Sequence, residues 1–194
     1  MFIELTDILR CPQPHDEQFL VLLPETMDGR SVRTGHLGCP VCHREYLVRD
    51  GVVAMGDVPA APPSPDAEVD ATAIAAFLGL AGPGGYVALA GDVPGLGSDL
   101  VTALPGVHLA AINPPTDTAE LPMMSVLRAP LIPIKTRSLR GVVLGRPFGA
   151  DPDWIGEAVR TLLPGLRVVG TGPAPAREDL DLLASAGNWW VATR

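Results

Sequence analysis

Residues 35–53, GHLGCPVCHREYLVRDGVV, set the fold of the first quarter of the chain. They contain Cys39 and Cys42, two thiols separated by a proline and a valine. A C-x-x-C turn of this kind points two thiolates at one tetrahedral cation and turns backbone N–H groups toward the sulfurs. Residues 46–49 (YLVR) then predict a β-strand, which the turn dipeptide at 50–51 closes.

Cys11 is the third cysteine, and His15 follows it four residues later. Three clustered cysteines point to metal binding before disulfides, because an odd number of thiols cannot pair completely. Three thiolates and one imidazole favour zinc, a borderline-soft ion that prefers tetrahedral sites. The predicted site is a closed Cys3His set: Cys11, His15, Cys39 and Cys42.

Two other histidines are alternatives for the fourth ligand. His36 precedes Cys39 by three residues and His43 follows Cys42 directly, so each belongs to a knuckle that already supplies two ligands. A metal-free remnant and a redox-active thiol pair are the other interpretations of the cysteines. A structural zinc would contribute on the order of 10 kcal/mol to this small region. A closed set leaves no coordination position for zinc catalysis.

The composition divides the chain into two predicted domains. Residues 57–66, DVPAAPPSPD, hold four prolines and predict an extended linker. Residues 1–56 form the β-rich metal-binding domain, with a second strand expected at 19–23. Residues 67–194 form the second domain, in which apolar strands alternate with helices.

That alternation predicts an α/β layered, mostly parallel sheet in the second domain. The expected strands are 86–90, 107–112, 125–128, 139–144, 166–170 and 189–193, and the expected helices are 67–80, 99–104, 153–163 and 177–186.

Two motifs in the first domain resemble the small zinc-ribbon family that includes the tRNA methyltransferase activator. Residues 5–12, LTDILRCP, are similar to the family's leading motif, and residues 39–52 are similar to its second knuckle. The chain departs from the family at the first knuckle, where Pro14 and His15 stand in place of a second cysteine. The resemblance covers residues 1–55 and implies a protein that binds or activates methyltransferases, or a ribbon fused to one.

Residues 67–194 resemble a class I methyltransferase domain that uses S-adenosylmethionine (SAM). Residues 133–143 (PIKTRSLRGVV), 153–169 (DWIGEAVRTLLPGLRVV) and 182–187 (LLASAG) are similar, in this order, to late motifs of that family. The resemblance implies a reduced Rossmann-like sheet with flanking helices. It also implies a cofactor site at Gly91, Gly95, Gly97 and Asn113.

The SAM site departs from the pattern of its family. Glycines after the first strand let the backbone approach the cofactor, and an acid after the second strand holds the ribose hydroxyls. Here Val93 and Pro94 interrupt the glycine spacing, and Asn113 stands where the acid belongs. The sequence therefore predicts a degenerate site and a pseudoenzyme, with SAM binding as the alternative.

Charge and composition exclude several classes of protein. The net charge of −8 repels phosphate backbones and argues against nucleic-acid binding, including RNA binding by the ribbon. A hydrophobic content of 47% excludes whole-chain disorder, and no apolar run approaches the ~18 residues of a membrane span. The first residues carry acids and no basic leader, so we expect a cytoplasmic protein without a signal peptide. One lysine against thirteen arginines suggests a GC-rich bacterial genome.

Two surface features suggest a protein partner or a second copy of the chain. Residues 128–146 contain five basic side chains and no acid, which fits a contact patch for an acidic partner or a solvated end of the sheet. Trp189 and Trp190 alternate across a strand, so one could anchor the core and the other a partner. The predicted function is a zinc-binding, non-catalytic partner, scaffold or accessory subunit. An active SAM-dependent methyltransferase is the alternative.

Overall fold

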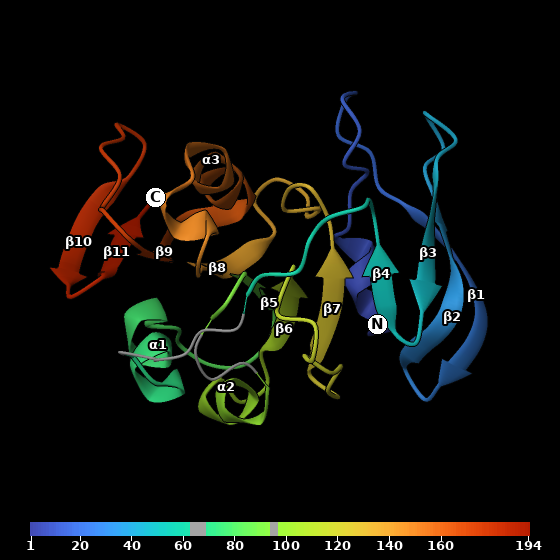
Figure 1. Ribbon diagram of the computed structural model, residues 1–194, viewed down its shortest axis with the longest axis horizontal. Coiled ribbons are helices and arrows are strands. Elements are labelled where there is room, and N and C mark those ends of the chain that lie inside the picture. The colour runs from blue at the N-terminus through green and yellow to red at the C-terminus, as the bar shows by residue number, and fades with distance from the viewer. Residues whose placement is uncertain (63–68, 94–96) are drawn as a thin grey trace.

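The computed structural model describes residues 1–62, 69–93 and 97–194, and within them all eleven strands belong to one sheet (Figure 1). The order across the sheet is β1 (Val21–Asp28), β2 (Ser31–Gly38), β3 (Glu45–Arg49), β4 (Val52–Ala54), β7 (Met124–Arg128), β6 (His108–Ile112), β5 (Tyr86–Ala90), β8 (Leu139–Leu144), β9 (Leu162–Thr171), β11 (Trp189–Thr193) and β10 (Asp181–Ala186). The described helices are α1 (Ala71–Leu78), α2 (Ser98–Ala103), α3 (Pro152–Thr161) and the 3-10 turns η1 (Ile3–Asp7) and η2 (Phe148–Ala150).

The predicted Rossmann-like α/β fold with flanking helices is wrong. The protein is mostly β, because helices cover 17% of the chain and the sheet is mixed. Pairing is parallel from β4 through β9 and antiparallel at both ends, among β1 to β4 and among β9 to β11. The apolar runs did mark the central strands, but period and composition do not reveal the antiparallel hairpins that extend the sheet at either end.

The helix expected at 177–186 is the clearest local error. Residues 181–186 are instead strand β10, which forms an antiparallel hairpin with β11 around Gly187 and Asn188. Ala186 pairs with Trp189, so the two strands are joined by a two-residue turn. Gly187 adopts a φ of +58°, a conformation that glycine reaches without strain and that favours the hairpin over a continuing helix.

The central strands are buried on both faces. In β5, Ala88 and Ala90 face one core cluster and Val87 and Leu89 face the other, as the two-residue period of a strand requires. The first cluster includes the apolar side of α3, whereas the second includes residues of α1 and α2. Figure 1 accordingly shows α3 on one side of the sheet and α1 and α2 on the other.

The first quarter of the chain continues the same sheet. β4 pairs in parallel with β7, so that Val53 lies opposite Leu127. Leu9 and Leu37 share one core cluster with Leu127 and Ile134. The division into two domains stays a prediction, and residues 63–66 of the expected linker lie outside the described residues.

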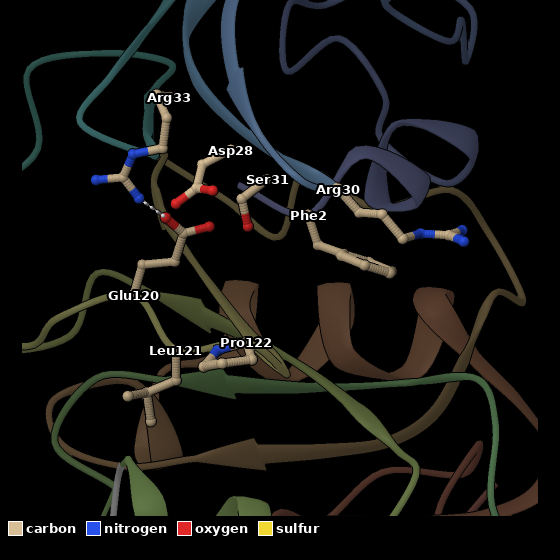
Figure 2. Close-up of a pocket in the computed structure, with 8 residues that line it drawn as sticks. All are labelled: Phe2, Asp28, Arg30, Ser31, Arg33, Glu120, Leu121 and Pro122. Carbon is tan, nitrogen blue, oxygen red and sulfur yellow. Dashed lines mark hydrogen bonds and ion pairs between the residues drawn. The ribbon is translucent and has the colours of Figure 1, made fainter.

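An open pocket of about 440 Å³ lies where the β1–β2 hairpin meets the segment before β7 (Figure 2). Arg33 donates to Glu120 across it, with 2.7 Å between guanidinium nitrogen and carboxylate oxygen. Arg30, at the same hairpin turn, forms an ion pair with Glu4. Both cations that line the pocket are thus neutralised by carboxylates, and the pocket marks a junction held by ion pairs.

Candidate metal centre

The four predicted metal ligands come together at one end of the sheet. Cys39 and Cys42 lie in the turn between β2 and β3, and Cys11 and His15 lie in the loop that follows η1. The ligand atoms of Cys11, His15, Cys39 and Cys42 all lie within 4.8 Å of one another. The possible Cys3His metal-binding group that the cysteine spacing predicts is therefore present in the fold.

Backbone hydrogen bonds hold the two ligand-bearing loops in position. The N–H of Cys39 donates to the Arg44 carbonyl at 2.9 Å, and the N–H of His43 donates back to the Cys39 carbonyl at 3.0 Å. The N–H of Cys11 donates to the carbonyl of Gln18 at 2.9 Å and closes the loop that carries His15. Backbone hydrogen bonds therefore close both loops.

Two of the distances between donor atoms match the edges of a tetrahedral zinc site. Cys11 Sγ lies 3.7 Å from Cys42 Sγ, and Cys39 Sγ lies 3.5 Å from His15 Nε2. Zinc bound at Zn–S distances of about 2.3 Å and Zn–N distances of about 2.0–2.1 Å has tetrahedral edges of about 3.8 Å between sulfurs and about 3.5 Å between sulfur and nitrogen. The thiol pair is also far longer than the ~2.05 Å of a disulfide bond.

Neighbouring groups orient two of the ligands. His15 Nδ1 donates to the carbonyl of Asp16 at 2.7 Å, which leaves Nε2 to face the thiolates. The hydroxyl of Tyr46 lies 3.2 Å from Cys11 Sγ, and both side chains are buried. A metal-bound thiolate carries no proton, so Tyr46 would be the donor. Outer hydrogen bonds of this type fix ligand orientation and tune metal affinity.

The surroundings shift the titration of the ligands. The backbone N–H of Arg44, aided by the adjacent donors of the cluster, lowers the pKa of Cys42 to about 7. Burial raises the pKa of the Cys11 thiol, against the hydrogen bond from Tyr46. The hydrogen bond to the Asp16 carbonyl raises the pKa of His15. Cys42 is thus more readily available as a thiolate near neutral pH than Cys11.

The structure separates the three candidate histidines. His36 Nε2 lies 3.0 Å from a carboxylate oxygen of Glu25, on the neighbouring strand. His43 has a φ of +58° at the end of the knuckle and is not among the clustered donors. His15 is the histidine that the fold brings to the thiols.

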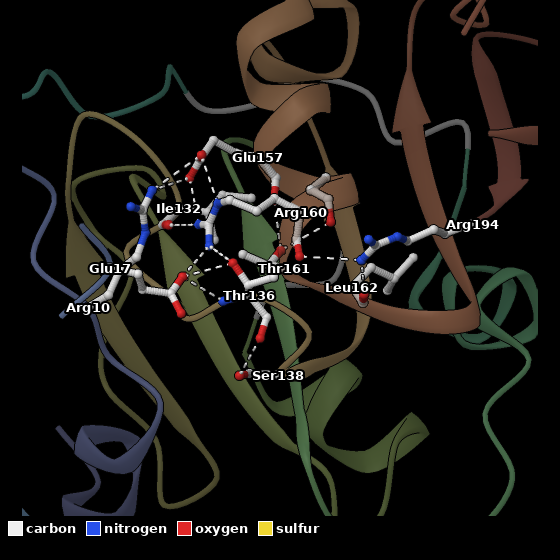
Figure 3. A network of polar contacts seen from close by, with 11 residues as sticks. Arg10, Glu17, Ile132, Thr136, Ser138, Glu157, Arg160, Thr161, Leu162 and Arg194 are labelled. Carbon is white, nitrogen blue, oxygen red and sulfur yellow. Dashed lines mark hydrogen bonds and ion pairs between the residues drawn. The ribbon is translucent and has the colours of Figure 1, made fainter. Parts of the chain in front are cut away.

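An ion-pair network fastens the ligand-bearing loop to the rest of the sheet (Figure 3). Glu17 lies two residues beyond His15 and accepts from Arg160 of α3 at 3.2 Å and from the N–H of Thr136 at 2.9 Å. Partial burial works to raise the pKa of Glu17, but the donors of Thr136 and the charge of Arg160 outweigh it, so the pKa is lowered. Arg10 and Arg160 share the carboxylate of Glu157, at 3.1 and 2.8 Å.

Tyr46 and Glu17 are residues of the site that the sequence analysis missed. Tyr46 could have been found, because Tyr46 and Val48 alternate as the buried face of β3. The role of Glu17 depends on Thr136 and Arg160, which are more than a hundred residues away in the chain, and no local signal points to it.

Two of the residues predicted for SAM binding, Gly91 and Asn113, contact the protein backbone. A Cβ on Gly91 would lie 2.3 Å from the carbonyl oxygen of Arg146, so the space beside this glycine is occupied by backbone. The Asn113 side chain is buried and exchanges two hydrogen bonds with the backbone of Ala129, at 2.7 and 2.9 Å. Gly97 precedes α2 with a φ of +100°, and Gly95 lies outside the described residues.

Most of the basic side chains in residues 128–146 form hydrogen bonds or ion pairs within the protein. Arg140 donates to four carbonyls between Ala81 and Gly84, and Arg128 donates to the carbonyls of Pro114 and Pro115. Lys135 donates to the carbonyl of Asp7 at 2.8 Å. These arginines and this lysine act as backbone caps, which favours the interpretation as an end of the sheet over a patch for an acidic partner.

Comparison with known proteins adds no assignment: no protein-family model matches the chain, and no curated protein matches it. Among the residues that the structure describes, no helix is both long and apolar enough to cross a membrane.

Proposed function

We propose that Cys11, His15, Cys39 and Cys42 bind one structural zinc ion. The observation that carries this proposal is the agreement between the two donor distances, 3.7 and 3.5 Å, and the edges of a tetrahedral zinc site. Four protein donors complete the coordination of zinc, so no position remains for a reacting water or substrate. Thiols that must stay reduced to hold an ion also fit the cytoplasmic compartment that the sequence predicts.

The role we propose for the whole protein is that of a non-catalytic partner, scaffold or accessory subunit. A closed metal set supplies rigidity and no chemistry, and the backbone of Arg146 fills the space beside Gly91. The resemblance of residues 1–55 to the tRNA methyltransferase activator family supports a role in binding another protein.

Metal analysis of single-residue variants tests the zinc proposal. The parent protein should contain one zinc per chain, and Cys39→Ser and His15→Ala should lose most of it. His43→Ala is the matched control, because it removes an imidazole beside the same knuckle and should leave the zinc content unchanged. A metal-free parent protein, or zinc lost from His43→Ala and kept by His15→Ala, would contradict the assignment.

Calorimetric titration with SAM tests the non-catalytic role separately. We expect no binding up to millimolar SAM, because Gly91 and Asn113 are closed off by Arg146 and Ala129. Saturable binding at micromolar SAM would contradict a non-catalytic role and leave the zinc assignment untouched.

A further inference from the structure

The outer strand β10 is exposed along its whole length. All six of its residues are exposed, whereas four of the five residues of its neighbour β11 are buried. β10 ends the sheet, so among the residues that the structure describes one row of its backbone N–H and C=O groups has no partner strand. Unpaired groups of this kind form a ready template for another β-strand.

Beyond Asp181, its first residue, β10 lacks the side chains that normally block strand addition. Residues 182–186, LLASA, contain no charge and no proline, and Leu182 and Leu183 are each 52% exposed. The one irregularity is a register shift between Leu182 and Ala184. At the other end of the sheet, β1 carries Pro24 and Glu25 and has two register shifts. Proline, charge and bulges are the usual protection of an edge. β1 combines all three, whereas β10 has one charge at its first residue and one register shift, so β10 is the less protected edge.

We propose that β10 pairs with β10 of a second copy of this chain, in an antiparallel arrangement about a twofold axis near Ala184. This register places Leu182 opposite Ala186 and Leu183 opposite Ser185, so each large side chain meets a small one. Asp181 then faces Gly187, and no two like charges lie opposite each other. An isologous contact of this kind closes into a dimer and continues the sheet from one molecule into the next.

The neutral surface is what favours a second copy over a foreign strand. A foreign strand would gain the same backbone hydrogen bonds, but residues 182–186 offer no charged side chain with which to select it. Self-pairing needs no such selection, because the strand is complementary to itself. The contact is a single short strand, so the dimer is weak and depends on concentration.

Charge gives the dimer a characteristic salt dependence. Each chain carries a net charge of −8, so two copies repel each other at long range, while residues 182–186 at the centre of the contact carry no charge. Added salt screens the repulsion and should shift the equilibrium toward the dimer. A contact held by ion pairs would weaken with salt instead.

Sedimentation velocity over a range of protein concentrations and salt tests the proposal. The parent protein should dimerise at high concentration, more so in salt, and Leu183→Lys should remain monomeric because it places a like charge on both strands of the contact. Leu23→Lys on β1 is the matched control, since Leu23 is also exposed, and it should dimerise like the parent. Ser185→Lys, at a second exposed position of β10, guards against misfolding of a single variant and should also be monomeric.

A parent protein that is monomeric at every concentration would overturn the proposal. So would a dimer that persists in both Leu183→Lys and Ser185→Lys, or one that is lost in Leu23→Lys. Because β10 and the metal cluster lie at opposite ends of the sheet, His15→Ala should still dimerise, and this result separates failure of the dimer from failure of the zinc site.

Discussion

At one end of the sheet, the outer strands β1 to β3 lie beside a cluster of three thiols and one imidazole. At the other end, β10 pairs with β11, which carries two buried tryptophans. The first end holds its loops with metal donors and ion pairs to α3. The second end is held by Trp189 and Trp190 of β11, one in each core cluster. We therefore expect the two ends of the sheet to be stabilised by different physical means, by the proposed zinc coordination at one end and by aromatic burial at the other.

The two edge strands of the sheet also differ in their side chains. β1 carries Pro24 and Glu25, which discourage strand addition, and β10 carries neither a proline nor a charge between Leu182 and Ala186. The proposed zinc at one end of the sheet and the buried tryptophans at the other predict different responses to the same perturbations.

Removal of zinc should produce the largest effect and should be confined to the metal end. Structural zinc contributes on the order of 10 kcal/mol to the segments that it ties together. After chelation, hydrogen exchange should accelerate for amides in residues 11–19 and 39–44, whose loops carry the ligands. Amides of β5, β8 and β11 should keep their protection, because the strands that pair with them carry none of the four ligands.

Loss of protection throughout the sheet after chelation would contradict the expectation that the two ends are stabilised independently. It would show that the metal supports the whole sheet and that the aromatic end has no stability of its own.

Truncation of Trp190 should produce the next largest effect, at the other end. The Trp190 side chain is fully buried, its indole N–H donates to the carbonyl of Gly149 at 3.2 Å, and its ring fills the place that a Cβ on Gly170 would take. Trp190→Ala should lower the free energy of unfolding by about 3–5 kcal/mol in denaturant titration.

Leu182→Ala is the control for that measurement, because Leu182 is half exposed and its truncation should cost about 0.5 kcal/mol or less. The zinc content of Trp190→Ala should equal that of the parent. If Trp190→Ala unfolds with the parent's free energy, aromatic burial does not anchor this end.

Removal of the Tyr46 hydroxyl should produce the smallest effect of the three, a decrease in zinc affinity. The hydroxyl lies 3.2 Å from Cys11 Sγ and would donate to the bound thiolate. Tyr46→Phe should weaken zinc binding roughly tenfold in competition with a chromophoric chelator, as for other outer hydrogen bonds. Tyr86→Phe, in β5, is the matched control and should bind zinc like the parent; equal affinities in both variants would rule out the outer hydrogen bond.

The sequence predicted the metal end well and the architecture poorly, for a physical reason. Cysteine spacing is a direct chemical signal, so Cys11, Cys39 and Cys42 could be placed in one cluster without knowledge of the fold. His15 could be favoured but not separated from His36 and His43, because that choice depends on where the loop after η1 turns back.

The architecture depended on contacts that no local pattern carries. The central strands were found because buried parallel strands are continuous apolar runs, as in residues 86–90. Residues 181–186 form a strand because they pair with β11, and this pairing is not visible in their own composition. The sequence therefore predicted a helix there. The parallel pairing of β4 with β7 joins residues more than seventy positions apart, and it is this pairing that extends one sheet across the whole molecule.

X-ray absorption spectroscopy of the purified protein at the zinc edge would measure the coordination of the proposed zinc ion. We expect the zinc ion to have three sulfur neighbours at about 2.3 Å and one nitrogen neighbour at about 2.0–2.1 Å. They would come from Cys11, Cys39, Cys42 and His15. A first shell with fewer than three sulfurs, or one that contains water oxygen, would contradict a closed Cys3His site.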